Sequence, residues 1–127
     1  MSTQSIDWLA YAQSDLWTAE LLQKFDEFPT AIHAFHCQQA TEKGLKAFLV
    51  HRNRPFLLRQ NLSYLLHLCE EIDESFQQLQ SDISGLEPYT TQAIYPADSR
   101  IMPTPEEARA FYAQAHKIIN FVKSKLL

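Results

Sequence analysis

The stretch that decides the fold is residues 35–49, which read FHCQQATEKGLKAFL. In a helix, steps of three and four place Gln38 and Glu42 on the same stripe as the apolar Phe35 and Leu45. A half-buried amide or carboxylate costs about 1–3 kcal/mol when it has no partner. We therefore expect these polar side chains either to form a hydrogen-bond network that fixes helix register or to line a ligand site.

The first helix offers partners for this stripe. Asp15 lies inside its otherwise apolar face, where a lone carboxylate would be costly. We predict a buried ion pair between Asp15 and either Lys43 or Lys46, which would set the register of the two helices. The predicted structural network consists of four residues: Asp15, Gln38, Gln39 and Glu42.

Four amphipathic patterns account for most of the chain. They cover residues 6–25, residues 30–51 with Thr30 as the cap, a stretch from Leu58 or Leu62 to Leu79, and a last helix that opens at Thr104-Pro105-Glu106-Glu107. This last sequence is a capping box with proline at the first helical position. A short extra helix is expected at about residues 82–91. The predicted fold class is all-α, an antiparallel up-and-down four-helix bundle formed by a single domain over residues 1–127.

Composition supports the same class. The chain has only two glycines, whereas a sheet protein of this length needs several glycine-containing turns. Cys37 and Cys69 are too few for a disulfide framework and fit a reducing compartment. There is no apolar run long enough to span a membrane and no basic signal-peptide start. We therefore expect a cytoplasmic protein without a membrane partner.

The charge is distributed unevenly. A net charge of -4 argues against strong, indiscriminate binding to nucleic acid. Residues 43–69, however, contain no Asp or Glu and hold five of the eleven Lys and Arg residues. Such a run is either a solvated helix end or a site for a phosphate-bearing partner such as a nucleotide or RNA. The candidate phosphate-binding residues are Lys43, Lys46, Arg52, Arg54 and Arg59.

Residues 35–49 also resemble the signature of the HEPN domain family. The resemblance extends to Trp8-Leu9-Ala10-Tyr11-Ala12-Gln13-Ser14-Asp15-Leu16 upstream, and downstream to Asn61-Leu62-Ser63-Tyr64-Leu65-Leu66, Tyr95-Pro96 and Pro105-Glu106-Glu107-Ala108. The family comprises small all-helical proteins found beside minimal nucleotidyltransferases and in toxin–antitoxin operons. The resemblance therefore implies a nucleotide- or RNA-associated or partner-binding module of such a system.

A second function implied by the resemblance is metal-independent endoribonuclease activity. Many ribonucleases of the family use an arginine followed by a histidine four to six positions later, and Arg109 and His116 have six residues between them. His116 would transfer a proton and Arg109 would hold the scissile phosphate. Seven positions along a helix place the two residues on one face but about 10 Å apart. The family's Arg-Tyr-Pro triplet reads Ile94-Tyr95-Pro96 here, and Gln60 replaces a common histidine, which weakens this alternative.

Other site types receive little support from the sequence. His33 and His36 are three positions apart, yet no third metal ligand is suggested nearby, so we predict neither a metal nor a cofactor.

An apolar content of 46% predicts an exposed helical face and a homodimer. Trp8 and Trp17 cannot share a narrow stripe, because nine positions turn a helix by about 180°. A structural helical adaptor, whose polar stripe serves only packing, remains the third functional alternative.

Overall fold

The computed structural model describes residues 2–89 and 102–126, and every regular element in these ranges is helical. The all-α prediction is confirmed. The elements are α1 (Thr3–Leu22), α2 (Thr30–His51), α3 (Leu62–Ile72), the 3₁₀ helix η1 (Glu74–Leu79), α4 (Gln80–Leu86), the 3₁₀ helix η2 (Glu87–Tyr89) and α5 (Pro105–Lys125). Within the described ranges, no helix has both the length and the apolar composition needed to cross a membrane.

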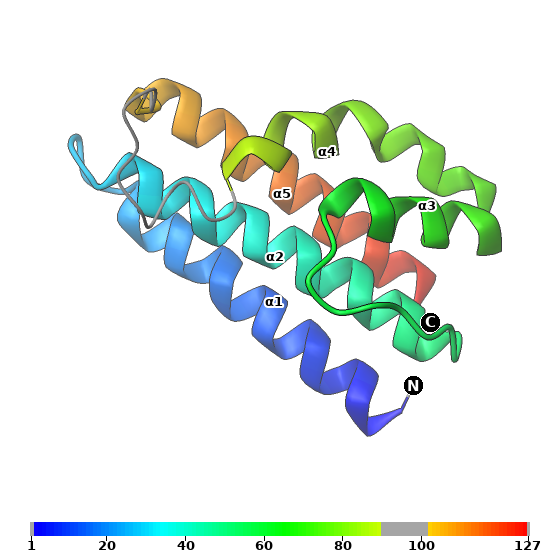
Figure 1. Cartoon of the computed structure of the whole chain (residues 1–127). Helices are drawn as coiled ribbons and strands as arrows, with labels where there is room; N and C mark the ends of the chain where they lie inside the picture. Colours follow the sequence, from blue (N-terminus) through cyan, green and yellow to red (C-terminus); the bar gives the residue numbers. More distant parts are fainter. Residues whose placement is uncertain (1, 90–101, 127) are drawn as a thin grey trace.

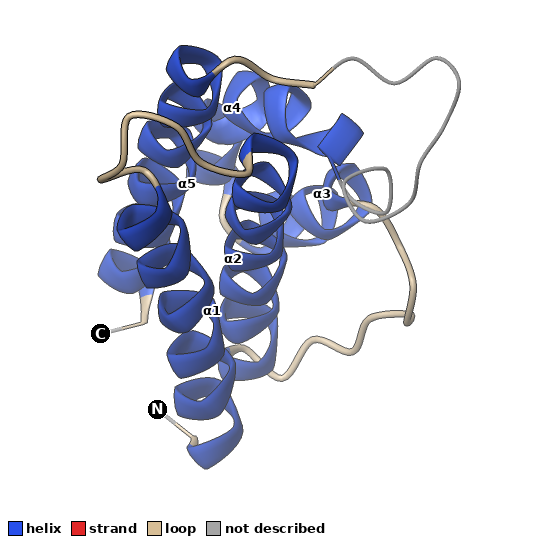
Figure 2. Cartoon of the chain, turned by 90° about the vertical axis from the view of Figure 1, so that its left-hand side faces the viewer, coloured by secondary structure: helices blue, strands red, loops and turns tan. Residues whose placement is uncertain are grey.

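Helix α2 is the centre of the bundle. It contacts α1, α5, α3 and α4, and both views show α1, α2 and α5 as three long, roughly aligned helices (Figures 1 and 2). The shorter helices α3 and α4 lie across the side of α2 and α5 that faces away from α1 (Figure 1). Thirteen of the 22 residues of α2 are buried. This central position places the polar stripe of α2 where α1 and the segment after α2 can reach it.

Gly44 allows α2 and α5 to approach closely. A Cβ atom built on Gly44 would lie 2.6 Å from Cδ1 of Ile119, which is inside any tolerated contact distance. Ile119 is itself buried in the core. The glycine therefore provides space for a side chain of the neighbouring helix, although glycine costs about 1 kcal/mol in a helix relative to alanine.

The prediction of one continuous third helix up to Leu79 is wrong, because α3 ends at Ile72 and η1 follows it. Its apolar period continues to Leu79, but the backbone leaves the helical region at Asp73, with φ -145° and ψ 104°. The Asp73 carboxylate accepts hydrogen bonds from the amide and hydroxyl of Ser75, and Lys125 lies 2.9 Å from it. The bundle consequently has five α-helices in the described part of the chain. The short helix expected at residues 82–91 corresponds to α4 and η2, and its last two residues lie outside the described ranges.

The predicted helix ends agree with the structure in one case and differ in two. Thr104 accepts from the amide of Glu107 and Glu107 accepts from the amide of Thr104, so the predicted capping box is confirmed. Thr30, predicted as a cap, is instead the first residue of α2 and is buried, while Pro29 is the capping residue. Helix α1 begins at Thr3 and ends at Leu22, about three residues before the predicted limits at each end.

Candidate functional site

Asp15 joins α1 to α2 through two basic side chains. Lys43 Nζ donates to Oδ2 at 2.6 Å, and His36 Nδ1 donates to Oδ1 at 2.8 Å. Burial on its own would raise the pKa of Asp15, but the hydrogen bonds from His36 and Lys43 outweigh it and hold the pKa below its usual range. The carboxylate is therefore charged, and each of its two oxygens accepts a hydrogen bond. Of the two lysines considered as partners, the structure places Lys43 beside Asp15.

The remaining members of the predicted polar network form separate pairs. Gln38 is almost fully buried and accepts a hydrogen bond from Gln39 at 2.8 Å. Glu42 pairs with Lys46 at 3.2 Å. Among the described residues, no hydrogen bond joins Gln38 or Glu42 to Asp15. The four predicted residues thus have partners, but the structure does not connect them into one network.

His33 and His36 point to different partners. His33 Nε2 donates to Gln23 Oε1 at 2.8 Å, and the thiol of Cys37 lies 3.8 Å from the other ring nitrogen. Burial, together with the positive charges of His36 and Arg109, lowers the pKa of His33 to about 4, so its ring is neutral at pH 7. In the part of the chain that the structure describes, no three His, Cys, Asp or Glu side chains are grouped as metal ligands.

Arg109 and His116 occupy different surroundings on α5. Arg109 Nη2 donates to the main-chain carbonyls of Gln23 and Phe25, at 3.1 and 3.0 Å, and its guanidinium lies 5.2 Å from the Phe28 ring centre. His116 is exposed, and its Nδ1 accepts from Asn120 at 3.3 Å. The arginine therefore binds the turn between α1 and α2. The segment Ile94-Tyr95-Pro96 lies outside the described residues.

The predicted phosphate-binding residues divide into two groups. Lys43 and Lys46 are paired with carboxylates, as described above. The three arginines follow α2, and within the described ranges none of them forms an ion pair. Arg52 lies over the Phe48 ring, Arg54 donates to the carbonyl of Pro55, and Arg59 is exposed with φ 61°. Positive charge without a carboxylate partner is thus concentrated in the segment between α2 and α3.

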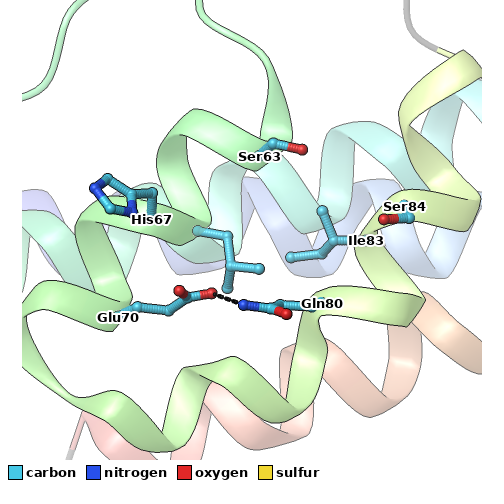
Figure 3. Close-up of a pocket in the computed structure, with 7 residues that line it drawn as sticks. Ser63, His67, Glu70, Gln80, Ile83 and Ser84 are labelled. Atoms are coloured by element: carbon cyan, nitrogen blue, oxygen red, sulfur yellow. Dashed lines mark hydrogen bonds between the residues drawn. The ribbon is translucent and has the colours of Figure 1, made fainter.

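A pocket of about 310 Å³ lies between α3 and α4. Figure 3 shows Glu70 and Gln80 pointing toward one another across it, and Gln80 Nε2 donates to Glu70 at 2.9 Å. No Lys or Arg is among its lining residues, and its one carboxylate comes from Glu70. The pocket therefore does not suit a phosphate.

A second, larger groove lies where the start of α1 meets the end of α2. It has a volume of about 490 Å³, and its lining includes three half-buried or exposed aromatic residues, Trp8, Tyr11 and Phe56. This groove was not predicted from the sequence. Trp8 and Tyr11 are three positions apart on one helical face, which is a detectable signal, but Phe56 joins them only because the segment after α2 folds back onto α1.

Family comparison identifies the fold. The model described as "HEPN domain" matches residues 5–125. The chain belongs to the HEPN domain family. The predicted resemblance is confirmed over nearly the whole chain. No curated protein matches this HEPN chain.

Two crystal structures are similar to this HEPN domain. TT1696 from Thermus thermophilus is 26% identical, with a TM-score of 0.79, over 98% of this chain and 100% of the other. ST0689, described as an archaeal HEPN homologue, is 20% identical, with a TM-score of 0.75, over 99% of this chain and 100% of the other. The second similarity concerns the fold alone.

Proposed function

We propose that this HEPN domain is a partner-binding module without nuclease activity, which forms a dimer with a second copy of itself and serves a minimal nucleotidyltransferase in a toxin–antitoxin-type system. The observation that carries the proposal is the outer face of α1. This face consists of exposed apolar residues on and just after the helix: Ile6, Trp17, Leu21 and Phe25.

These residues form one stripe. Ile6 and Trp17 are eleven positions apart, which is close to three full helical turns, and Leu21 follows one turn later. An exposed stripe of large apolar side chains on a small domain is typical of a binding surface. The exposed Gln13 also lies on this stripe, between Ile6 and Trp17, so the apolar surface is concentrated at Trp17, Leu21 and Phe25. The same surface on a second copy can pack against it around a two-fold axis.

The contacts of Arg109 support a non-catalytic role. Its Nη2 atom is used by the carbonyls of Gln23 and Phe25, so two of its N–H groups are not available to a phosphate in this arrangement. His116 makes a hydrogen bond to Asn120 on its own helix. An RNA cleavage assay tests the proposed absence of nuclease activity, and we expect no cleavage. Cleavage that disappears in His116→Ala would favour the endoribonuclease alternative instead.

Dimerisation is tested by the mass of the protein in solution. Light scattering at micromolar concentration should give the dimer mass for the natural protein and the monomer mass for Trp17→Glu. Tyr11→Glu is the matched control, because Tyr11 is 64% exposed and Trp17 is 62% exposed, but the two lie on different faces of α1. A monomeric natural protein, or equal dissociation by both substitutions, would contradict the proposed surface.

The nucleotidyltransferase partnership has its own test. If a gene for a minimal nucleotidyltransferase lies beside the gene for this chain, the two products should copurify after co-expression. Absence of such a neighbour together with a stable dimer would leave the structural adaptor as the better account.

A further inference from the structure

We propose that the connection between α2 and α3, residues 52–61, docks on the surface of a membrane that contains anionic phospholipids. Its leucines enter the boundary between the headgroups and the acyl chains, and its arginines lie among the lipid phosphates. The sequence predicted no membrane partner because no segment could span a bilayer, but binding at the surface needs no spanning segment. This surface is separate from the outer face of α1 and does not depend on the proposed dimer.

The connection exposes two adjacent leucines. Leu57 is 63% exposed and Leu58 is 76% exposed, and no other large apolar side chain among the described residues is as exposed as Leu58. Figure 2 shows the connection running along the outside of the bundle. A single exposed apolar side chain needs no explanation, but an adjacent pair on an outer connection, flanked by positive charge, indicates an interaction surface.

Contacts on both sides of the leucines fix the backbone of the connection. Before them, the Phe56 ring packs edge-on against Trp8, with ring centres 6.5 Å apart. The amide of Leu57 donates to the hydroxyl of Tyr64 on α3 at 3.1 Å. After them, Arg59 adopts a left-handed conformation with φ 61°, which turns the chain toward α3. The leucines are thus held in an exposed position before any partner binds, so that docking requires little further ordering of the chain.

Positive charges flank the leucines on both sides. Arg52 and Arg54 precede them, Arg59 follows Leu58 directly, and none of the three arginines forms an ion pair within the described ranges. An anionic membrane attracts each such charge, and the attraction acts over about one Debye length, roughly 8–10 Å. Apolar side chains that enter the interface beside these charges add a contribution that salt does not screen.

Two carboxylates lie close to the connection. Glu87 accepts from the amides of Leu62 and Ser63, at 2.9 and 3.1 Å, and so is bound to the start of α3. Asp7, on α1, lines a groove together with Phe56. Because the whole chain has a net charge of -4, an anionic membrane repels most of its surface and attracts the protein only when the connection faces the lipid. The protein therefore docks in one orientation.

A membrane accounts for the leucines and the arginines together. A small free anion would use the arginines but would leave both leucines exposed to water. An acidic protein partner would need an apolar pocket shaped to receive them. A lipid interface takes up projecting apolar side chains without such a pocket, and its phosphates lie at the level of the flanking charges.

Flotation of the full chain with lipid vesicles tests the proposal. The natural protein should float with phosphatidylcholine vesicles that contain about one third phosphatidylglycerol, should not float with phosphatidylcholine alone, and should be released as salt is raised. Glycerol phosphate, a soluble form of the headgroup, should not displace it at millimolar concentration. Displacement by glycerol phosphate would assign the arginines to a free anion, and binding to polyglutamate as tight as to vesicles would indicate an acidic protein; either result would overturn the proposal.

The apolar contribution is tested by replacing Leu57 and Leu58 together with serine. This double substitution should weaken vesicle binding at least about tenfold, because the inserted apolar side chains are lost while the charge is unchanged. Met102→Ser is the matched control, since Met102 is 52% exposed and lies just before α5, whose start is at the other end of the bundle (Figure 1). Equal effects of the leucine substitutions and the control would overturn the proposal.

The charged contribution is tested by Arg59→Gln, which should weaken vesicle binding about fivefold at low salt. Lys24→Gln is the control, because it removes an exposed positive charge from the turn between α1 and α2, away from the connection. All the substituted side chains are exposed, so the variants should fold as the natural protein does. Equal weakening by the two substitutions would show that vesicle binding does not depend on this connection.

Two further results would overturn the proposal. One is the absence of flotation with anionic vesicles at low salt. The other is loss of flotation in Trp17→Glu while the leucine variant floats normally, which would place the membrane contact on the outer face of α1. None of the vesicle experiments bears on the dimer, which is judged by mass alone.

Discussion

Arg109 reaches from α5 to the turn after α1, where its guanidinium meets two carbonyls and the face of Phe28. These carbonyls belong to Gln23 and Phe25, which lie just after the end of α1, where main-chain carbonyls lack an intrahelical partner. A single side chain thus connects the last helix to the connection between the first two. One nitrogen, Nη2, donates to both oxygens, while the planar guanidinium also lies over the Phe28 ring, a contact that favours arginine over lysine.

Replacing Arg109 by alanine should therefore lower the free energy of unfolding by about 1–2 kcal/mol, since two hydrogen bonds to the turn are lost. His116→Ala should change it by less than about 0.5 kcal/mol, because His116 is exposed. Urea denaturation of the two variants measures the difference. Equal effects would show that Arg109 does not hold the turn.

His33 should make stability depend on pH. Its pKa is about 4 in the folded protein and about 6.5 when the chain is unfolded, so between these values the unfolded state binds more protons. Stability should then fall as the pH decreases from 6.5 to 4. In His33→Gln, which cannot titrate, the urea midpoint should vary less over this interval. An unchanged pH profile in the variant would contradict the assignment.

At the scale of the elements, the contact of α2 with α5 depends on Gly44. Gly44→Ala should destabilise the natural protein by about 1 kcal/mol, because overpacking against Ile119 outweighs the better helix propensity of alanine. In an Ile119→Val background the atom Cδ1 is absent, and the same substitution should become neutral or stabilising. Thermal unfolding of the four proteins in this double-mutant cycle measures the coupling. Additive effects would rule out the steric explanation.

The elements that could be predicted from the sequence are those with local signals. The capping box at Thr104 sets the start of α5, and Pro55 limits α2, because both act on the backbone within a few residues. The break at Asp73 could not be predicted in this way. The apolar period continues through it, and the ion pair with Lys125 comes from the far end of the chain.

In the candidate sites, too, only the contacts that leave a signal in the sequence could be predicted. A pairing of Asp15 with Lys43 or Lys46 could be predicted, since a charge on an apolar face requires a partner on the facing helix. The choice of Lys43 between the two came from the structure. The acceptors of Arg109 are main-chain carbonyls, which carry no signal in the sequence. The aromatic groove depends on how the segment after α2 folds back, and so it became visible only in three dimensions.

At the scale of the whole molecule, the proposed dimer links stability to concentration. A protein that associates only when folded gains stability by mass action as its concentration rises. The midpoint of thermal unfolding should therefore increase with protein concentration for the natural chain and stay constant for Trp17→Glu. A midpoint independent of concentration in the natural chain would count against association of the folded state.

The two cysteines lie in different parts of the bundle, Cys37 on α2 and Cys69 on α3, and both are fully buried. Burial raises the pKa of Cys37 to about 12, and the pKa of Cys69 is raised in the same way. Only a thiolate reacts readily with an alkylating reagent, so the folded protein should resist modification. The rate of alkylation of each cysteine then reports how often its own helix opens. We expect Cys69 to be alkylated before Cys37 under mild denaturation, as mass spectrometry of the digested protein would record, because the short helix α3 can detach while the central α2 remains enclosed.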